Sequence, residues 1–104
     1  MNLENIYEIF KESTGVSTDT RSIKKNNLFI ALSGENFNGN KFAEKAIDEG
    51  ANYAIIDDEK FQTERTILVE NTLKTLQNLA NYHRKQLKVT IMLWVSHAYL
   101  IFWE

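Results

Sequence analysis

The stretch Leu28-Phe29-Ile30-Ala31-Leu32 decides the fold. It is a run of five apolar residues, with the turn-forming residues Lys25-Asn26-Asn27 before it and Ser33-Gly34 after it. A short apolar run between two turn signals is typical of a strand that is buried on both faces of a sheet. The sequence therefore predicts an α/β layer fold, in which helices cover the sheet.

Helices and strands alternate around this strand. Apolar residues at helical spacing predict a first helix over Leu3–Phe10, a second over Phe42–Glu49 and a third from Asn71, as N-cap, to about Lys85. The β-rich runs Tyr53–Ile56 and Thr66–Val69 predict two further strands, each central in the sheet. We expect a single α/β domain of three layers, with a small mixed β-sheet and about three helices.

Composition limits the classes of function. The chain has 104 residues, 43% of them hydrophobic and 25% charged, which is typical of one globular domain. Twelve basic against fourteen acidic residues give a net charge of −2, which argues against a nucleic-acid partner. The absence of cysteine excludes disulfides, thiolate nucleophiles and zinc–thiolate sites. The first residues show no secretory signal, so the default expectation is a cytoplasmic protein.

The C-terminal residues 89–104 differ from the rest. No Asp, Glu, Lys or Arg occurs from Val89 to Trp103, and both tryptophans lie there. The segment is shorter than the roughly 20 residues that cross a membrane, and it contains polar residues, so no membrane span is expected. Two interpretations remain: a buried last strand, or a hydrophobic extension prone to aggregate.

The segment Gly34–Lys41 nearly matches a phosphate-binding P-loop, G-x-x-x-x-G-K-[ST]. Lys41 comes one residue late, which turns it about 100° round a helix, and Phe42 stands where a magnesium-binding hydroxyl is needed. We therefore expect no ATP turnover by this chain. Either the two glycines and the next helix N-terminus suit another anionic ligand, or the segment is an ordinary loop rich in Gly and Asn.

A second polar cluster is Ser17-Thr18-Asp19-Thr20-Arg21-Ser22. Its hydroxyl and guanidinium groups can donate to phosphate or sugar oxygens while Asp19 orients Arg21. The alternative is a solvated turn in which Asp19 or Ser22 bonds nearby backbone groups.

Two further clusters are expected to be structural. His83 and Arg84 are interpreted as a solvated cap at the end of the third helix, where positive charge is favourable. Asp57-Asp58-Glu59 is interpreted as a solvated turn, because three consecutive acids cannot all face one metal ion.

Several of these segments, taken in order, resemble the N-terminal domain of the Mur ligase family. They are the Thr18-Asp19-Thr20-Arg21 element, the strand and loop Leu28–Gly39, and the start of the next helix at Phe42-Ala43. Gly50–Ile55 and Leu79–Arg84 also match the family's pattern. The resemblance covers about residues 13–88, and within the family it is nearest to the branch that adds D-alanyl-D-alanine.

The resemblance implies a domain that holds the UDP moiety of a UDP-N-acetylmuramoyl-peptide. Family enzymes are ATP-dependent amide ligases of peptidoglycan synthesis, and they use ATP and Mg²⁺ in later domains. Carried over by position, the threonines are substrate contacts, residues 35–37 form the uridine-side loop, and the others are scaffold. No catalytic residue or metal ligand is expected in this chain. The candidate substrate-binding residues are Thr18, Thr20, Arg21, Glu35, Asn36, Phe37, Asn38 and Gly39.

The chain departs from the family in two places. Asn26-Asn27 replaces a usual Gly-Asp, which is mild because Asn tolerates left-handed backbone. After Val89 the family continues into a Gly-Lys-Thr-Thr ATP loop, which is missing here. We therefore expect residues 1–88 to be the UDP-substrate domain of a truncated, frame-shifted or trimmed ligase. The alternatives are a natural stand-alone interaction module, or an inert fragment, that self-associates through residues 89–104.

Overall fold

The computed structural model describes residues 2–35 and 37–103, with side chains up to Lys88. Its sheet has four parallel strands in the order β1-β2-β3-β4. The strands are β1 (Val16–Ser17), β2 (Leu28–Ile30), β3 (Tyr53–Ile56) and β4 (Thr66–Leu68). The helices are α1 (Leu3–Glu12), α2 (Ala43–Asp48) and α3 (Thr72–Trp103), with 3-10 turns η1 (Thr20–Ser22), η2 (Gly39–Phe42) and η3 (Glu59–Phe61). The predicted α/β class is confirmed.

Two details of the predicted sheet are wrong. The sheet is wholly parallel and not mixed, because each connection from one strand to the next is a crossover that returns the chain to the end of the sheet where the previous strand began. The connection between Ser17 and Leu28 is also a crossover of this kind, although its only regular element is the 3-10 turn η1. The strand Thr66–Leu68 lies at the edge of the sheet and is not central, since the chain leaves the sheet after it and enters α3.

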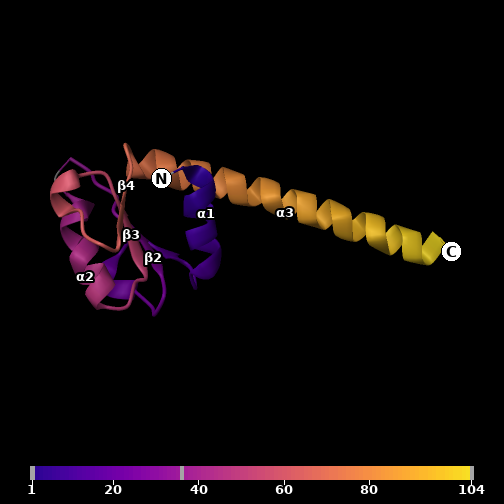
Figure 1. Ribbon diagram of the computed structural model, residues 1–104, viewed down its shortest axis with the longest axis horizontal. Helices are drawn as coiled ribbons and strands as arrows, with labels where there is room; N and C mark the ends of the chain where they lie inside the picture. The colour runs from indigo at the N-terminus through magenta and orange to yellow at the C-terminus, as the bar shows by residue number, and fades with distance from the viewer. Residues whose placement is uncertain (1, 36, 104) are drawn as a thin grey trace.

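The strand order explains the three layers. Parallel crossovers are right-handed, so connections between successive strands that advance in one direction all lie on the same face. That face carries α2 and packs Ile23, Phe42, Ile47 and Phe61 from the crossovers against its core. The opposite face is covered by α1 and the start of α3, which contact each other (Figure 1).

The central strand β2 supplies both cores by alternation. Leu28 and Ile30 pack into the cluster under α1 and α3, whereas Phe29 and Ala31, the residue that follows the strand, pack into the cluster under α2. All four are at most 2% exposed. The predicted doubly buried strand is confirmed.

Helix α3 is longer than the sequence analysis predicted. It runs without interruption from Thr72 to Trp103, past the expected end near Lys85. Of the two interpretations of the C-terminal segment, a last strand is therefore wrong. The chain has no Gly or Pro in this range, so nothing local stops a helix. Its second half projects from the body, and the molecule measures 60 × 25 × 24 Å (Figure 1). Over the residues whose side chains are described, no helix is both long and apolar enough to cross a membrane.

Candidate functional site

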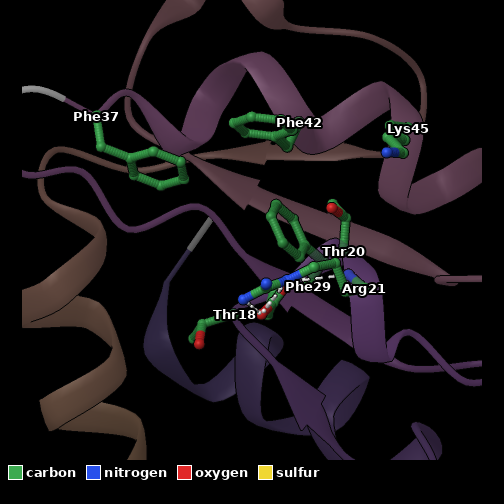
Figure 2. Close-up of a pocket in the computed structure, with 8 residues that line it drawn as sticks. Thr18, Thr20, Arg21, Phe29, Phe37, Phe42 and Lys45 are labelled. Carbon is green, nitrogen blue, oxygen red and sulfur yellow. Dashed lines mark hydrogen bonds and ion pairs between the residues drawn. The ribbon is translucent and has the colours of Figure 1, made fainter.

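A cavity of about 480 Å³ lies on the crossover face, between η1 and the segment that forms η2 and α2. Its floor is Phe29 of β2, which is 2% exposed. Figure 2 shows side chains from η1, β2, η2 and α2 around one space. The lining residues are Thr18, Asp19, Thr20, Arg21, Phe29, Phe37, Phe42 and Lys45.

One wall of the cavity is built by a carboxylate–guanidinium pair. Asp19 is the N-cap of η1 and accepts from the Arg21 backbone N–H at 2.8 Å. Its carboxylate also accepts from Nε of Arg21 at 3.1 Å and from Nη2 at 2.8 Å. These side-chain hydrogen bonds, followed by the backbone one, lower the pKa of Asp19 from 3.8 to about 2. Asp19 thus accepts a backbone hydrogen bond in the turn and also orients Arg21. The two interpretations of this cluster, a turn and an oriented guanidinium, are therefore both correct for Asp19.

Two hydroxyls beside this pair are free to bind a ligand. Thr20 is 8% exposed, yet within the described residues neither its hydroxyl nor that of Thr18 has a hydrogen-bond partner. No fully buried side-chain N or O atom in the described part lacks a partner, so the Thr20 hydroxyl must reach open space. Figure 2 shows it directed toward Phe29 and Lys45.

The opposite wall is aromatic and ends in a cation. The rings of Phe37 and Phe42 stack with centroids 5.4 Å apart and planes inclined by 16°. Phe37 is 53% exposed, so this pair presents an open apolar surface. Lys45 follows Phe42 by three residues and therefore lies on the same side of the helix. Its Nζ is 4.0 Å from the nearest carboxylate, that of Glu49.

The structure brings together four of the predicted site residues: Thr18, Thr20, Arg21 and Phe37 line the cavity. Glu35 is exposed and does not line it, and Asn36 lies outside the described residues.

Asn38 and Gly39 lie at the end of the loop, where η2 begins. The side chain of Asn38 caps η2, and a Cβ at Gly39 would overlap the carbonyl oxygen of Leu32. The sequence allowed either a scaffold role for Gly39 or a close approach to a ligand; in the structure Gly39 permits a close approach between two backbone segments.

Three lining residues were missed by the sequence analysis. Phe42 and Lys45 were placed on a helix, and their spacing of three could have indicated a shared face. Phe29 carries a different signal: it is the large side chain on the α2 face of β2, where its neighbour on that face is Ala31. Neither signal by itself indicates which side of the helix or strand is open.

The structure corrects one residue in each of the two clusters interpreted as solvated, His83 and Asp57, whereas Arg84 and Glu59 are exposed as expected. His83 lies inside α3, where its Nδ1 is hydrogen-bonded to the Tyr7 hydroxyl at 3.1 Å and its ring meets that of Phe10. Asp57 binds Asn40 and Thr72, while Asp58 caps η3. Within the described residues no group of three His, Cys, Asp or Glu side chains could hold a metal ion.

Comparison with known proteins agrees with this fold. The family described as "Mur ligase family, catalytic domain" matches residues 12–91. This match covers most of the chain, and the chain therefore belongs to the Mur ligase family.

The relatives within the family are peptidoglycan-precursor ligases. The chain is 37% identical over 82 residues to the UDP-N-acetylmuramoyl-tripeptide–D-alanyl-D-alanine ligase of Bacillus subtilis, covering 75% of this chain and 18% of that one. It is 33% identical over 76 residues to the 2,6-diaminopimelate-adding ligase of Rickettsia typhi, covering 72% and 15%. The chain thus spans less than a fifth of the length of these relatives.

Solved structures of the D-alanyl-D-alanine-adding ligase MurF share the fold. The Thermotoga maritima enzyme, determined with ADP, superposes with a TM-score of 0.61 at 25% identity over 70% of this chain and 17% of that one. The Acinetobacter baumannii enzyme gives a TM-score of 0.64 at 20% identity over 82% and 21%.

Proposed function

We propose that this chain binds the UDP moiety of UDP-N-acetylmuramoyl-tripeptide in the cytoplasm. It would do so as the N-terminal part of a MurF-like ligase, whose parent reaction is the ATP-dependent addition of D-alanyl-D-alanine. The observation that carries the proposal is the cavity over Phe29, which combines an aromatic wall, two unpaired hydroxyls and two cationic side chains. Similarity to named ligases of that specificity supports it.

The cavity has chemistry suited to each part of a UDP group. A pyrimidine ring can stack on the exposed face of the Phe37–Phe42 pair. The hydroxyls of Thr18 and Thr20 can donate to ribose or phosphate oxygens. Arg21 and Lys45 supply the positive charge that a diphosphate requires.

We further propose that ATP and Mg²⁺ bind outside these residues, so that this chain alone does not turn over ATP. In a P-loop the backbone N–H groups cradle phosphates. Here the N–H of Gly39 donates to Ser33 Oγ, and the N–H groups of Asn40 and Lys41 donate to Asn38. These donors are already bonded within the chain, which argues against a phosphate cradle in this loop.

The test is an amide NMR titration of the full chain with UDP-N-acetylmuramoyl-tripeptide, UDP and ATP. We expect saturable shifts at residues 18–21, at Phe37 and at Lys45 with both UDP compounds but not with ATP. The affinity should be low, because a single open cavity buries only part of the substrate. A dispersed spectrum that none of the compounds shifts at millimolar concentration would contradict the proposal. ADP release by the pure chain would contradict the absence of ATP turnover.

A further inference from the structure

A reciprocal pair of hydrogen bonds joins the end of β3 to the start of η2. Asn40 Nδ2 donates to Oδ1 of Asp57 at 2.9 Å, and the Asp57 backbone N–H donates to Oδ1 of Asn40 at 3.0 Å. Asn40 is 3% exposed, so its amide has little access to water. Loss of the Asp57 acceptor would leave one of the two Nδ2 hydrogens of Asn40 without an acceptor, which is costly at a buried site.

The same amide connects onward to the loop that carries Phe37. The backbone N–H and Nδ2 of Asn40 both donate to Oδ1 of Asn38, at 3.1 and 2.9 Å. Ser33 Oγ donates to the same oxygen at 3.4 Å and accepts from the Gly39 N–H at 3.0 Å. The base of the loop between Ser33 and Gly39 is thus closed by one connected set of hydrogen bonds that begins at Asp57.

The second oxygen of Asp57 faces the start of α3. Oδ2 accepts from the backbone N–H and the hydroxyl of Thr72, both at 3.3 Å. Thr72 is 2% exposed, and its hydroxyl also donates to the Ala31 carbonyl at 2.7 Å. Asp57 therefore has donors on both oxygens, a pattern that a carboxylate satisfies and an amide cannot.

We infer that Asp57 is a positioning residue for the proposed nucleotide site, acting through Asn40 on the loop that places Phe37 at the cavity. This inference rests on the proposed function for its ligand. Asp57 does not line the cavity itself, so its effect on binding must pass through the loop.

The direction of the change in Kd distinguishes a positioning role of Asp57 from a direct effect of its charge. Replacing Asp57 by Asn removes a negative charge near an anion site, which by Coulomb's law alone favours the anion. The same replacement sets an amide donor against a donor of either Asn40 or Thr72, so the hydrogen bonds that Asp57 makes on its two sides can no longer all form, and the loop is disturbed. We expect Asp57→Asn to raise the Kd for UDP about fivefold, roughly the effect of one hydrogen bond. The adjacent Asp58→Asn, which removes the same charge from a residue that only caps η3, should leave the Kd unchanged or lower.

A second control separates positioning from loss of stability. Thr72→Val removes the hydroxyl that bonds Asp57 and Ala31 but does not touch Asn40. It should lower the unfolding temperature and leave the Kd for UDP within twofold. Asn40→Ala removes the side-chain hydrogen bonds between Asn40 and Asp57 at the Asn40 end. It replaces Asp57→Asn as the test variant if Asp57→Asn does not fold. The Asp57→Asn/Asn40→Ala double variant should bind UDP no more weakly than the weaker single variant.

Amide hydrogen exchange measures how firmly the loop is held, and it needs no ligand. In the free protein the amides of Gly39 and Asn40 should exchange faster in Asp57→Asn than in Asp58→Asn. Equal rates in the two variants, or an unchanged Kd in Asp57→Asn, would overturn the positioning role. If the unmodified chain does not bind UDP, the proposed function fails, and the exchange rates alone decide whether Asp57 holds the loop.

Discussion

At the scale of single residues, the clearest electrostatic feature is the pair formed by Asp19 and Arg21. Hydrogen bonds from Arg21 hold the pKa of Asp19 at about 2, below its ordinary value of 3.8. A depressed carboxyl pKa contributes stability that is present above the ordinary value and is lost as the pH falls through the folded one. We expect the carboxyl ¹³C shift of Asp19 to titrate near pH 2, so the pair stays intact at every physiological pH.

The matched variant is Arg21→Gln, which removes the guanidinium. The titration midpoint of Asp19 should then return toward 3.8, apart from the part caused by the backbone N–H of residue 21. A midpoint that stays near 2 in this variant would show that Arg21 does not lower the pKa.

Lys45 gives a second prediction at this scale. Its ammonium lies at the cavity, with only a distant carboxylate to neutralise it, so Lys45→Gln should weaken UDP binding about three- to tenfold. Because the lost interaction is ionic, the Kd of this variant for UDP should also change less with salt concentration than the Kd of the unmodified chain. Calorimetry at two salt concentrations measures both effects. Lys41→Gln, an exposed lysine outside the cavity lining, is the control, and an equal loss in both variants would mean that only net charge matters.

At the scale of elements, the loop from β2 to η2 depends on one glycine. A Cβ at Gly39 would overlap the backbone of Leu32, while a Cβ at Gly34 would meet nothing within 4 Å. Gly39→Ala should therefore lower the free energy of unfolding by about 1–3 kcal/mol, the usual cost of overpacking. Gly34→Ala in the same loop should change it by no more than about 0.5 kcal/mol. Urea denaturation distinguishes the two, and similar midpoints would contradict the close approach.

The contact between α1 and α3 gives another prediction. Tyr7 is 7% exposed, packs against Tyr82 and reaches Nδ1 of His83. Tyr7→Phe should cost about 1 kcal/mol and lower the unfolding temperature by about 4–8 °C. Tyr53→Phe is the control, because the Tyr53 hydroxyl makes no hydrogen bond to another described residue. An equal loss in the control would remove the reason to assign this energy to the Tyr7–His83 bond.

Local patterns predicted the elements better than their ends or partners. The run Leu28–Leu32 and its turn signals located β2, because a strand that is buried on both faces consists of consecutive apolar residues. The direction of the neighbouring strands depends on crossovers, which have no local signature. The end of α3 was misplaced because no residue between Lys85 and Trp103 stops a helix.

The candidate site divides in the same way. Asp19 and Arg21 are two residues apart, so their pairing could be predicted from spacing. The cavity also needs Phe29 and Lys45, which come from a strand and a helix that only the folded chain brings together. His83 was assigned to solvent because Tyr7, its partner, lies 76 residues away in the sequence.

At the scale of the whole molecule, the body and the far half of α3 are separate in space (Figure 1). The sheet, both apolar clusters and the cavity are all built from residues 3–82. Leu79 and Tyr82 are the last residues of α3 that these clusters contain. The contribution of α3 to these clusters therefore comes from the part of the helix before Lys85.

This separation predicts the result of removing residues 89–104. A chain that ends at Lys88 should keep a dispersed amide spectrum, an unfolding temperature within about 2 °C and the same Kd for UDP, because the far half of α3 projects away from the sheet and its covering helices (Figure 1). The segment 89–103 is mostly apolar in sequence and carries no charged residue, which favours association, so the full chain should elute as a larger species than the shortened one. Size-exclusion chromatography with light scattering compares the two. An assembly that survives the deletion would place the association surface on the body, and a collapsed spectrum would show that the body depends on residues beyond Lys88.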